Sequence, residues 1–119
     1  MANIMIADDS DAIRLVLKDI LAIGKHTVVA EAVNGDEAVD LFLKLSPDLL
    51  LLDLAMPKKD GLTVLKEIME KNPQSKVVLI TASDDQKIIN QCLQTGALSY
   101  ISKPFDFHDV LKQINDSLS

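Results

Sequence analysis

The chain has 119 residues, of which 48% are hydrophobic, and a formal net charge of -6 at pH 7. That size suits one domain with one core, and the negative charge disfavours nucleic-acid binding because no cluster of Lys or Arg offsets it. The longest apolar run, Leu49 to Leu52, is far shorter than the ~20 residues that span a bilayer, and the N-terminus has no signal-peptide pattern. We therefore expect a soluble, cytoplasmic protein that binds neither nucleic acid nor membrane.

Along the chain, short apolar runs rich in Leu and β-branched residues alternate with segments whose apolar residues recur at helical spacing. The runs are near-continuously apolar, which is typical of strands covered on both faces of a parallel sheet. In chain order, the predicted strands are Ile4–Ala7, Val28–Ala30, Leu49–Leu52, Val77–Ile80 and Leu98–Ile101. The predicted helices carry apolar stripes over Ile13–Leu21, Ala38–Leu45, Leu62–Met69, Ile88–Leu93 and Val110–Leu118.

Helix start and stop signals agree with these stripes. Ser10, Asn34 and Ser83 are candidate N-caps, Asn72-Pro73 ends the third helix, and Gly96 follows the fourth. The single cysteine, Cys92, has no partner for a disulfide, so we interpret it as a small core residue of the fourth helix.

Five strand–helix units in strict alternation predict a three-layer α/β domain with right-handed crossovers and a central parallel sheet. No linker or repeat interrupts the pattern, so residues 1–119 are expected to form a single domain. The last predicted helix runs almost to Ser119, which leaves no length for an effector domain.

Polar residues follow four of the predicted strands directly. Because parallel strands all end at the same edge of a sheet, these residues should be neighbours in space: Asp8, Asp9, Asp53, Thr81 and Lys103. Three close carboxylates repel one another and need a cation or a proton, and hard oxygen ligands without His or Cys favour Mg²⁺. The simpler alternative is that the acids are solvated loop residues, or that they favour a helix N-terminus.

The chain resembles the receiver domain of bacterial and archaeal response regulators over essentially its whole length. The resemblance rests on Asp8-Asp9, Asp53-Leu-Ala-Met-Pro57 with Gly61, Thr81-Ala82-Ser83, Gly96-Ala97, Tyr100, and Lys103-Pro104-Phe105. It implies a flavodoxin-like (βα)5 fold, a doubly wound parallel sheet with strand order 2-1-3-4-5.

The resemblance also implies roles for these residues. Asp53 would accept a phosphoryl group from the phosphohistidine of a sensor histidine kinase, or from a small donor such as acetyl phosphate. Thr81 and Lys103 would hold phosphoryl oxygens. The expected Mg²⁺ ligands are Asp9 and Asp53 directly, Asp8 through water, and the backbone carbonyl of Ala55. Such a module acts on itself, so it is a signalling protein and not an enzyme.

Other matched positions imply a switch. On phosphorylation the Thr81 hydroxyl would move toward the phosphoryl group, and Tyr100 would turn from an exposed to an inward rotamer. An output surface on the fourth helix, fifth strand and fifth helix, including Ile89, Tyr100 and Ser102, would carry the signal. The resemblance further implies a cis peptide bond before Pro104. Lys58 and Lys59 are expected to be solvated loop lysines.

The predicted function is therefore a single-domain, monomeric response regulator of a two-component system. Two roles stay open: a chemotaxis regulator that binds a motor or adaptor when phosphorylated, or a phosphorelay intermediate that passes the group to a histidine phosphotransfer protein.

Two functions of other classes fit less well. A Mg²⁺-dependent phosphatase would carry a second acid where Ala55 stands, and it would need a cap insertion. An FMN-binding electron carrier would have a turn rich in Ser, Thr and Gly in place of Asp8-Asp9.

Overall fold

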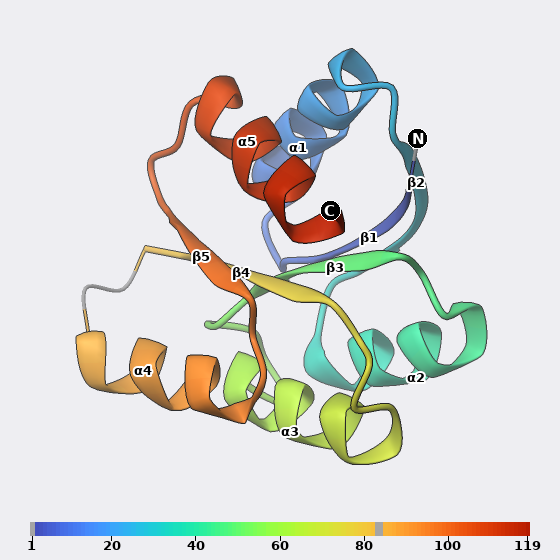
Figure 1. Cartoon of the computed structure of the whole chain (residues 1–119). Coiled ribbons are helices and arrows are strands. Elements are labelled where there is room, and N and C mark those ends of the chain that lie inside the picture. The colour runs from blue at the N-terminus through green and yellow to red at the C-terminus, as the bar shows by residue number, and fades with distance from the viewer. Residues whose placement is uncertain (1, 83–84) are drawn as a thin grey trace.

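The computed structural model describes residues 2–82 and 85–119, in which strands and helices alternate from the N-terminus to the C-terminus (Figure 1). The strands are β1 (Asn3–Ala7), β2 (Thr27–Ala32), β3 (Leu49–Asp53), β4 (Val77–Thr81) and β5 (Ser99–Ser102). The helices are α1 (Asp11–Ile23), α2 (Gly35–Leu45), α3 (Gly61–Lys71), α4 (Gln86–Thr95) and α5 (Phe107–Leu118).

The five strands form one parallel sheet in the order β2-β1-β3-β4-β5. Helices α1 and α5 cover one face of the sheet, and α2, α3 and α4 cover the other (Figure 1). The predicted flavodoxin-like fold and its strand order are thus confirmed. The point where the strand order reverses lies between β1 and β3, which is where such folds bind ligands.

The central strand shows why this sequence forms a sheet covered on both sides. Leu49, Leu50, Leu51 and Leu52 are all fully buried, since alternate side chains point to opposite faces and each face carries helices. The edge strand β2 differs, because exposed and half-buried positions alternate over its first four residues. It extends beyond the predicted Val28–Ala30 at both ends.

Two apolar clusters, one on each face, hold the layers together. One joins α2, α3 and α4 to the sheet and contains Phe42, Leu65 and Cys92; the other joins α1 and α5 and contains Leu17 and Val110. Burying each such side chain contributes about 1.5–3 kcal/mol. Cys92 is the core residue we predicted, and desolvation raises the pKa of its thiol, which keeps it protonated.

Each helix begins at the edge of the sheet where the strands end, and an acceptor side chain caps it. Ser10 and Asn34 cap α1 and α2 as predicted, accepting hydrogen bonds from the amides of Ile13 and Glu37. Ser83 lies outside the described residues, and the N-cap of α4 is Asp85. In the described part of the chain, no helix is long and apolar enough to cross a membrane.

Candidate functional site

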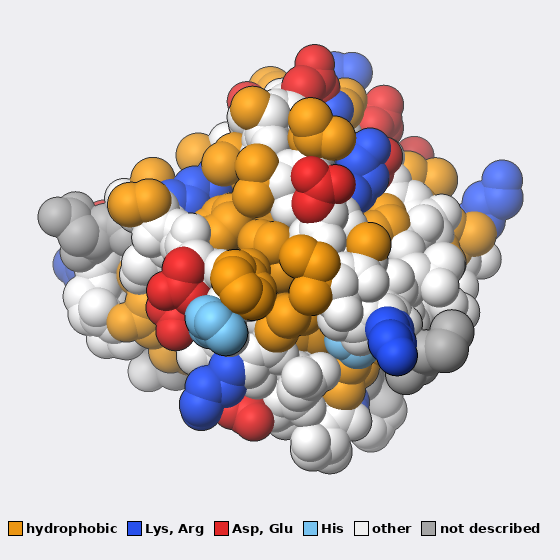
Figure 2. Space-filling model, turned by 90° about the horizontal axis from the view of Figure 1, so that it is seen from above, with side chains coloured by type: hydrophobic (Ala, Val, Ile, Leu, Met, Phe, Trp, Pro, Cys, Tyr) orange, Lys and Arg blue, Asp and Glu red, His pale blue; other side chains and the backbone are white. Residues whose placement is uncertain are grey.

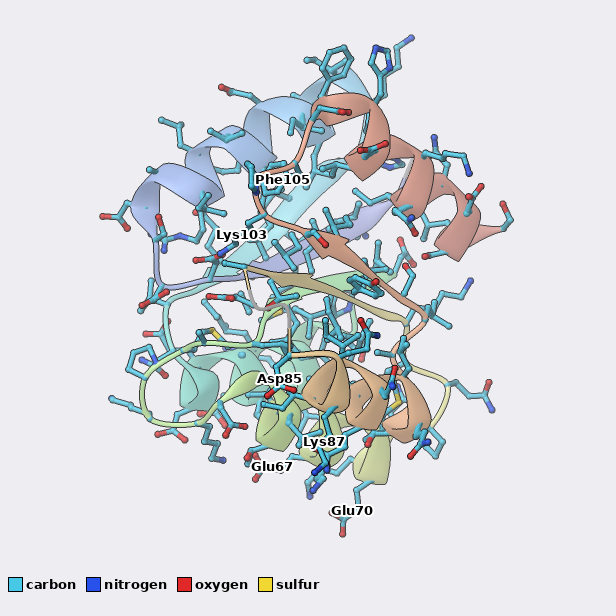
Figure 3. The ribbon with its side chains drawn as sticks, turned by 90° about the vertical axis from the view of Figure 1, so that its left-hand side faces the viewer. Glu67, Glu70, Asp85, Lys87, Lys103 and Phe105 are labelled. Carbon is cyan, nitrogen blue, oxygen red and sulfur yellow. The ribbon has the colours of Figure 1, made fainter. Side chains whose placement is uncertain are left out.

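The carboxyl edge of the sheet carries a compact group of charged side chains, of which Lys103 is labelled in Figure 3. β1 ends just before Asp8, β3 ends at Asp53, β4 ends at Thr81, and β5 ends just before Lys103. The strand registers place Asp53 opposite Ile80 and Thr81 opposite Ser102. Residues from four distant parts of the sequence therefore meet at one place, as the strand pattern predicted.

Three carboxylates form the acidic part of the site. One oxygen from each of Asp8, Asp9 and Asp53 lies within 4.8 Å of the others. Asp8 is 1% exposed and Asp53 is 4% exposed, whereas Asp9 is open to solvent. Solvated loop acids would not be buried in this way, so the simpler alternative does not describe Asp8 and Asp53.

Lys103 supplies the cation that these acids face. Its Nζ donates to Asp8 Oδ2 at 3.0 Å and lies 3.7 Å from Asp53 Oδ1. The Lys103-Pro104 peptide bond is cis, as expected, and Phe105 packs against the α1–α5 cluster (Figure 3). The packing of Phe105 anchors the segment that carries Lys103, and the ion pair with Asp8 orients its ammonium.

The electrostatic state of Asp53 follows from its surroundings. Burial raises the pKa of this carboxyl above its ordinary value near 3.8, and the neighbouring charge of Asp8 raises it further. The amide of Ala55, which donates to Asp53 Oδ1 at 3.3 Å, and the ammonium of Lys103 act in the opposite direction without cancelling the rise. Ionising Asp53 in the folded protein therefore costs more free energy than ionising a solvated aspartate.

The donor set fits a divalent cation. Three carboxylates beside one ammonium leave two negative charges uncompensated when all are ionised, and two of these acids are buried. The ligands are hard oxygen atoms, and none of the residues in this cluster is His or Cys. Such a site suits Mg²⁺, which keeps several waters and takes few protein ligands.

Thr81 lies beside this cluster and is 2% exposed. It follows Leu79 by two positions, so the two side chains share a face of the sheet. Leu79 is opposite Tyr100 in the neighbouring strand, and Tyr100 packs against the cluster under α3 and α4. Thr81 and Tyr100 therefore lie on the same face, one strand apart.

The loop after β3 is held by contacts that the sequence did not indicate. Lys59, expected to be solvated, pairs with Glu67 at 2.8 Å and with Asp36 at 3.4 Å, which joins the loop to α3 and α2. Gly61 donates to Leu54 O, and a Cβ at Gly61 would lie 2.6 Å from Leu54 Cα and 2.8 Å from Asp53 O. The start of α3 thus packs directly on the backbone that carries Asp53.

Gly61→Ala is expected to destabilise the protein by about 1–3 kcal/mol and to weaken Mg²⁺ binding, because the backbone of Asp53 must shift to make room. Urea denaturation with and without Mg²⁺ measures both effects. Gly24→Ala is the control, since its nearest obstacle is the far end of the Leu111 side chain. Equal losses in the two variants would contradict a special role for Gly61.

Arg14 makes a second set of contacts that the sequence analysis did not predict. It is 9% exposed, and its Nη1 donates to the backbone carbonyl of Asp8 at 2.6 Å while its Nε donates to Glu31 at 3.0 Å. Arg14 therefore ties the end of β1 to α1 and β2. The available signal was its spacing from Leu17 and Leu21, which places it on the buried face of α1.

The expected output surface needs one correction. Ile89 is 2% exposed and belongs to the core, so its side chain is not available to a partner in this conformation. The residue before it in α4, Ile88, points outward and is 39% exposed. Tyr100 is half-buried and Ser102 is exposed.

Comparison with known proteins agrees with this geometry. The sequence profile of the response regulator receiver domain matches residues 4–115. The chain is 40% identical over 117 residues to the chemotaxis protein CheY of Bacillus subtilis, covering 98% of both chains, and 35% identical over 113 residues to CheY of Thermotoga maritima, covering 95% of this chain and 94% of that one.

Among solved structures, the CheX-CheY-BeF3-Mg complex from Borrelia burgdorferi has a TM-score of 0.95 and 32% identity, covering 98% of this chain and 89% of that chain. The receiver domain of CheB from Thermotoga maritima has a TM-score of 0.84 and 31% identity, over 98% and 92%. Sequence, fold and the acidic edge of the sheet thus agree, and the chain belongs to the response regulator receiver domain family.

Proposed function

We propose that this receiver domain accepts a phosphoryl group on Asp53 in a Mg²⁺-dependent reaction and signals through the resulting conformational change. The observation that carries the proposal is the buried Asp53 carboxylate, which lies with Asp8 and Asp9 within 4.8 Å and beside the ammonium of Lys103. The phosphodonor is the phosphohistidine of a sensor histidine kinase.

The residues have distinct tasks in this transfer. An oxygen of Asp53 attacks phosphorus in line with the leaving group, while the Thr81 hydroxyl and Lys103 Nζ hold the phosphoryl oxygens. Asp9, Asp53 and the Ala55 carbonyl would bind Mg²⁺ directly, and Asp8 would act through water. The cation, when bound, supplies positive charge to neutralise the oxygens of the transferred group. Asp53 needs no general base, because its attacking form is already the carboxylate.

A solved relative supports this assignment. The structure of CheY from Borrelia burgdorferi contains BeF3 and Mg, and it superposes on this chain with a TM-score of 0.95. A trifluoride of beryllium has the size and charge of a phosphoryl group. A ligand of that kind together with Mg fits the cluster of Asp8, Asp9, Asp53 and Lys103 described above.

An exposed apolar band offers the kinase a docking surface next to the site. Leu15 and Val16 of α1 and Phe107 of α5 are 57%, 46% and 42% exposed, and both helices begin at the active edge. Figure 2 shows hydrophobic side chains gathered between these two helices. We infer that the part of the kinase that carries the phosphohistidine contacts this band through apolar side chains.

The switch would use the face that Thr81 shares with Tyr100. If the Thr81 hydroxyl turns toward the phosphoryl group, it leaves space beside β5 into which the half-buried Tyr100 ring can move. That motion changes the surface around Ser102, which is exposed at the end of β5. Phosphorylation then shifts a population of conformers that a protein partner distinguishes.

A chemotaxis role is the first candidate for the pathway, because the two CheY relatives match this chain over almost their entire length. The target would then be a motor or adaptor protein that binds the phosphorylated form. The alternative is a phosphorelay intermediate that passes the group to a histidine phosphotransfer protein. Retention of the phosphoryl group in the complex indicates the first role, and its transfer to a partner histidine indicates the second.

The proposal is tested by the intact mass of the protein after incubation with acetyl phosphate, with Mg²⁺ or with EDTA. We expect one phosphoryl adduct that forms only with Mg²⁺ and is removed by mild alkali, as an acyl phosphate is. If folded protein shows no adduct over a time course that includes early points, and no partner kinase transfers label to it, the proposal is wrong.

A further inference from the structure

The cavity that contains Asp53 extends well beyond the charged cluster. It has a volume of about 500 Å³, within the range of about 300–1,000 Å³ that small-molecule sites occupy. One end holds Asp9, Asp53, Thr81 and Lys103. The other end is lined by Leu54 from the loop after β3, Leu62 from the start of α3, and Ile88 and Gln91 from α4.

The second end is apolar and carries no cation among the described residues. Ile88 projects from α4 and remains 39% exposed, although its neighbour Ile89 is buried. Asp60, the acid nearest this end, already caps α3 by accepting from the amide of Thr63 at 2.9 Å. An anionic group would find no cation here, whereas an apolar group would cover the exposed side chain of Ile88.

The direction of phosphoryl transfer connects the two ends. The leaving group lies opposite the attacking oxygen of Asp53, so it extends from phosphorus into the part of the cavity that the phosphoryl group does not fill. The acetyl group of acetyl phosphate is small and leaves the apolar wall formed by Leu54, Leu62 and Ile88 uncovered.

We propose that this cavity binds small phosphodonors whose leaving group carries an apolar substituent, with benzoyl phosphate as the representative acyl phosphate. The proposal rests on the phosphoacceptor function of Asp53 and names the donor class that the same site selects. As Asp53 forms its bond to phosphorus, the bond from phosphorus to the acyl oxygen breaks, and benzoate leaves with the electron pair. The step needs neither an oxidant nor a proton.

The test compares rate constants for adduct formation from benzoyl phosphate and acetyl phosphate with Mg²⁺ present, followed by intact mass. The two leaving groups have similar basicity, so the comparison isolates the apolar contact. We expect benzoyl phosphate to react about 5–30-fold faster at low concentration, which partial burial of an aromatic ring supplies. Ile88→Ser should bring that ratio close to one, and Leu98→Ser, an exposed leucine outside the cavity, should preserve it.

Binding is measured separately with phenylphosphonate, which cannot transfer its group. Titration should shift the methyl NMR signal of Ile88 and not that of Ile23, an exposed isoleucine at the far end of α1, and methylphosphonate should shift neither. Equal rate constants for the two donors, or an Ile88 signal that does not move, would overturn the proposal. The apolar wall would then serve as a contact for a side chain of a partner protein. If neither donor gives an adduct, no partner kinase transfers label, and phenylphosphonate still shifts Ile88, the phosphoacceptor function is wrong and the apolar site stands.

Discussion

Asp53→Asn is expected to abolish the phosphoryl adduct and, in metal-free buffer at pH 7, to raise the free energy of unfolding by about 1–3 kcal/mol. Loss of the adduct follows because the amide is not a nucleophile. The gain in stability follows because the substitution removes a buried charge that lies within 4.8 Å of two other carboxylates. Under the proposed function, the same side chain would provide the chemistry and lower the stability, as is common where function requires buried charge.

The stability advantage of Asp53→Asn over the wild type should increase with pH. The folded protein holds the pKa of Asp53 above its ordinary value near 3.8, so between these two values the native state binds more protons than the unfolded chain. Stability contributed by Asp53 therefore falls as pH rises through that window. The two proteins should be equally stable below it, and the variant should gain its advantage as pH increases.

Urea denaturation of both proteins across this pH range, in EDTA and in Mg²⁺, measures the difference. Mg²⁺ should stabilise the wild type by about 2.7 kcal/mol at one hundred times its dissociation constant, and the variant by less. Asp116→Asn is the matched control, because Asp116 lies on α5 with 65% of its side chain exposed. A variant that is less stable than the wild type at pH 7 without metal would contradict the electrostatic account.

The parts of the fold that could be predicted are those in which local pattern and burial agree. Leu49–Leu52 was identified as a strand because four consecutive apolar residues need cover on both faces, and the structure buries all of them. The observed strand boundaries differ from the predicted ones where the apolar residues and the residues that pair with a neighbouring strand are not the same. Leu98 is apolar but 48% exposed and outside β5, whereas the polar Ser102 is inside it because it pairs with Thr81.

The positions of Asp8, Asp53 and Lys103 could be predicted because topology alone brings the ends of parallel strands together. The contacts of Arg14 and Lys59 could not, since each depends on partners in other elements that no local pattern reveals. Ile88 and Ile89 show a further limit. Adjacent isoleucines at the border of a helical stripe are equivalent in sequence, and only packing decides which one is buried.

Lys103→Met is expected to cost about 2–4 kcal/mol of stability in metal-free buffer, and to slow adduct formation with Mg²⁺ by about 10²–10³-fold. Lys103 is the cation bonded to Asp8, whose side chain is 1% exposed, so its removal leaves this buried carboxylate with the amide of Ser10 as a donor but without its opposite charge. The rate is expected to fall because the methionine side chain keeps the apolar stem and lacks the charge proposed to hold a phosphoryl oxygen.

Lys112→Met provides the comparison, because Lys112 pairs with Asp116 on the exposed face of α5 with 74% of its side chain in solvent. Exposed pairs contribute about 0–1 kcal/mol, so this variant should unfold almost as the wild type does. Mg²⁺ should restore most of the stability that Lys103→Met loses, since a divalent cation can neutralise the same carboxylates, but it should not restore the rate. That separation would distinguish the two tasks proposed for Lys103: neutralising Asp8, which a metal can replace, and contacting the phosphoryl group, which it cannot. Recovery of both stability and rate with Mg²⁺ would show that Lys103 serves the acids alone.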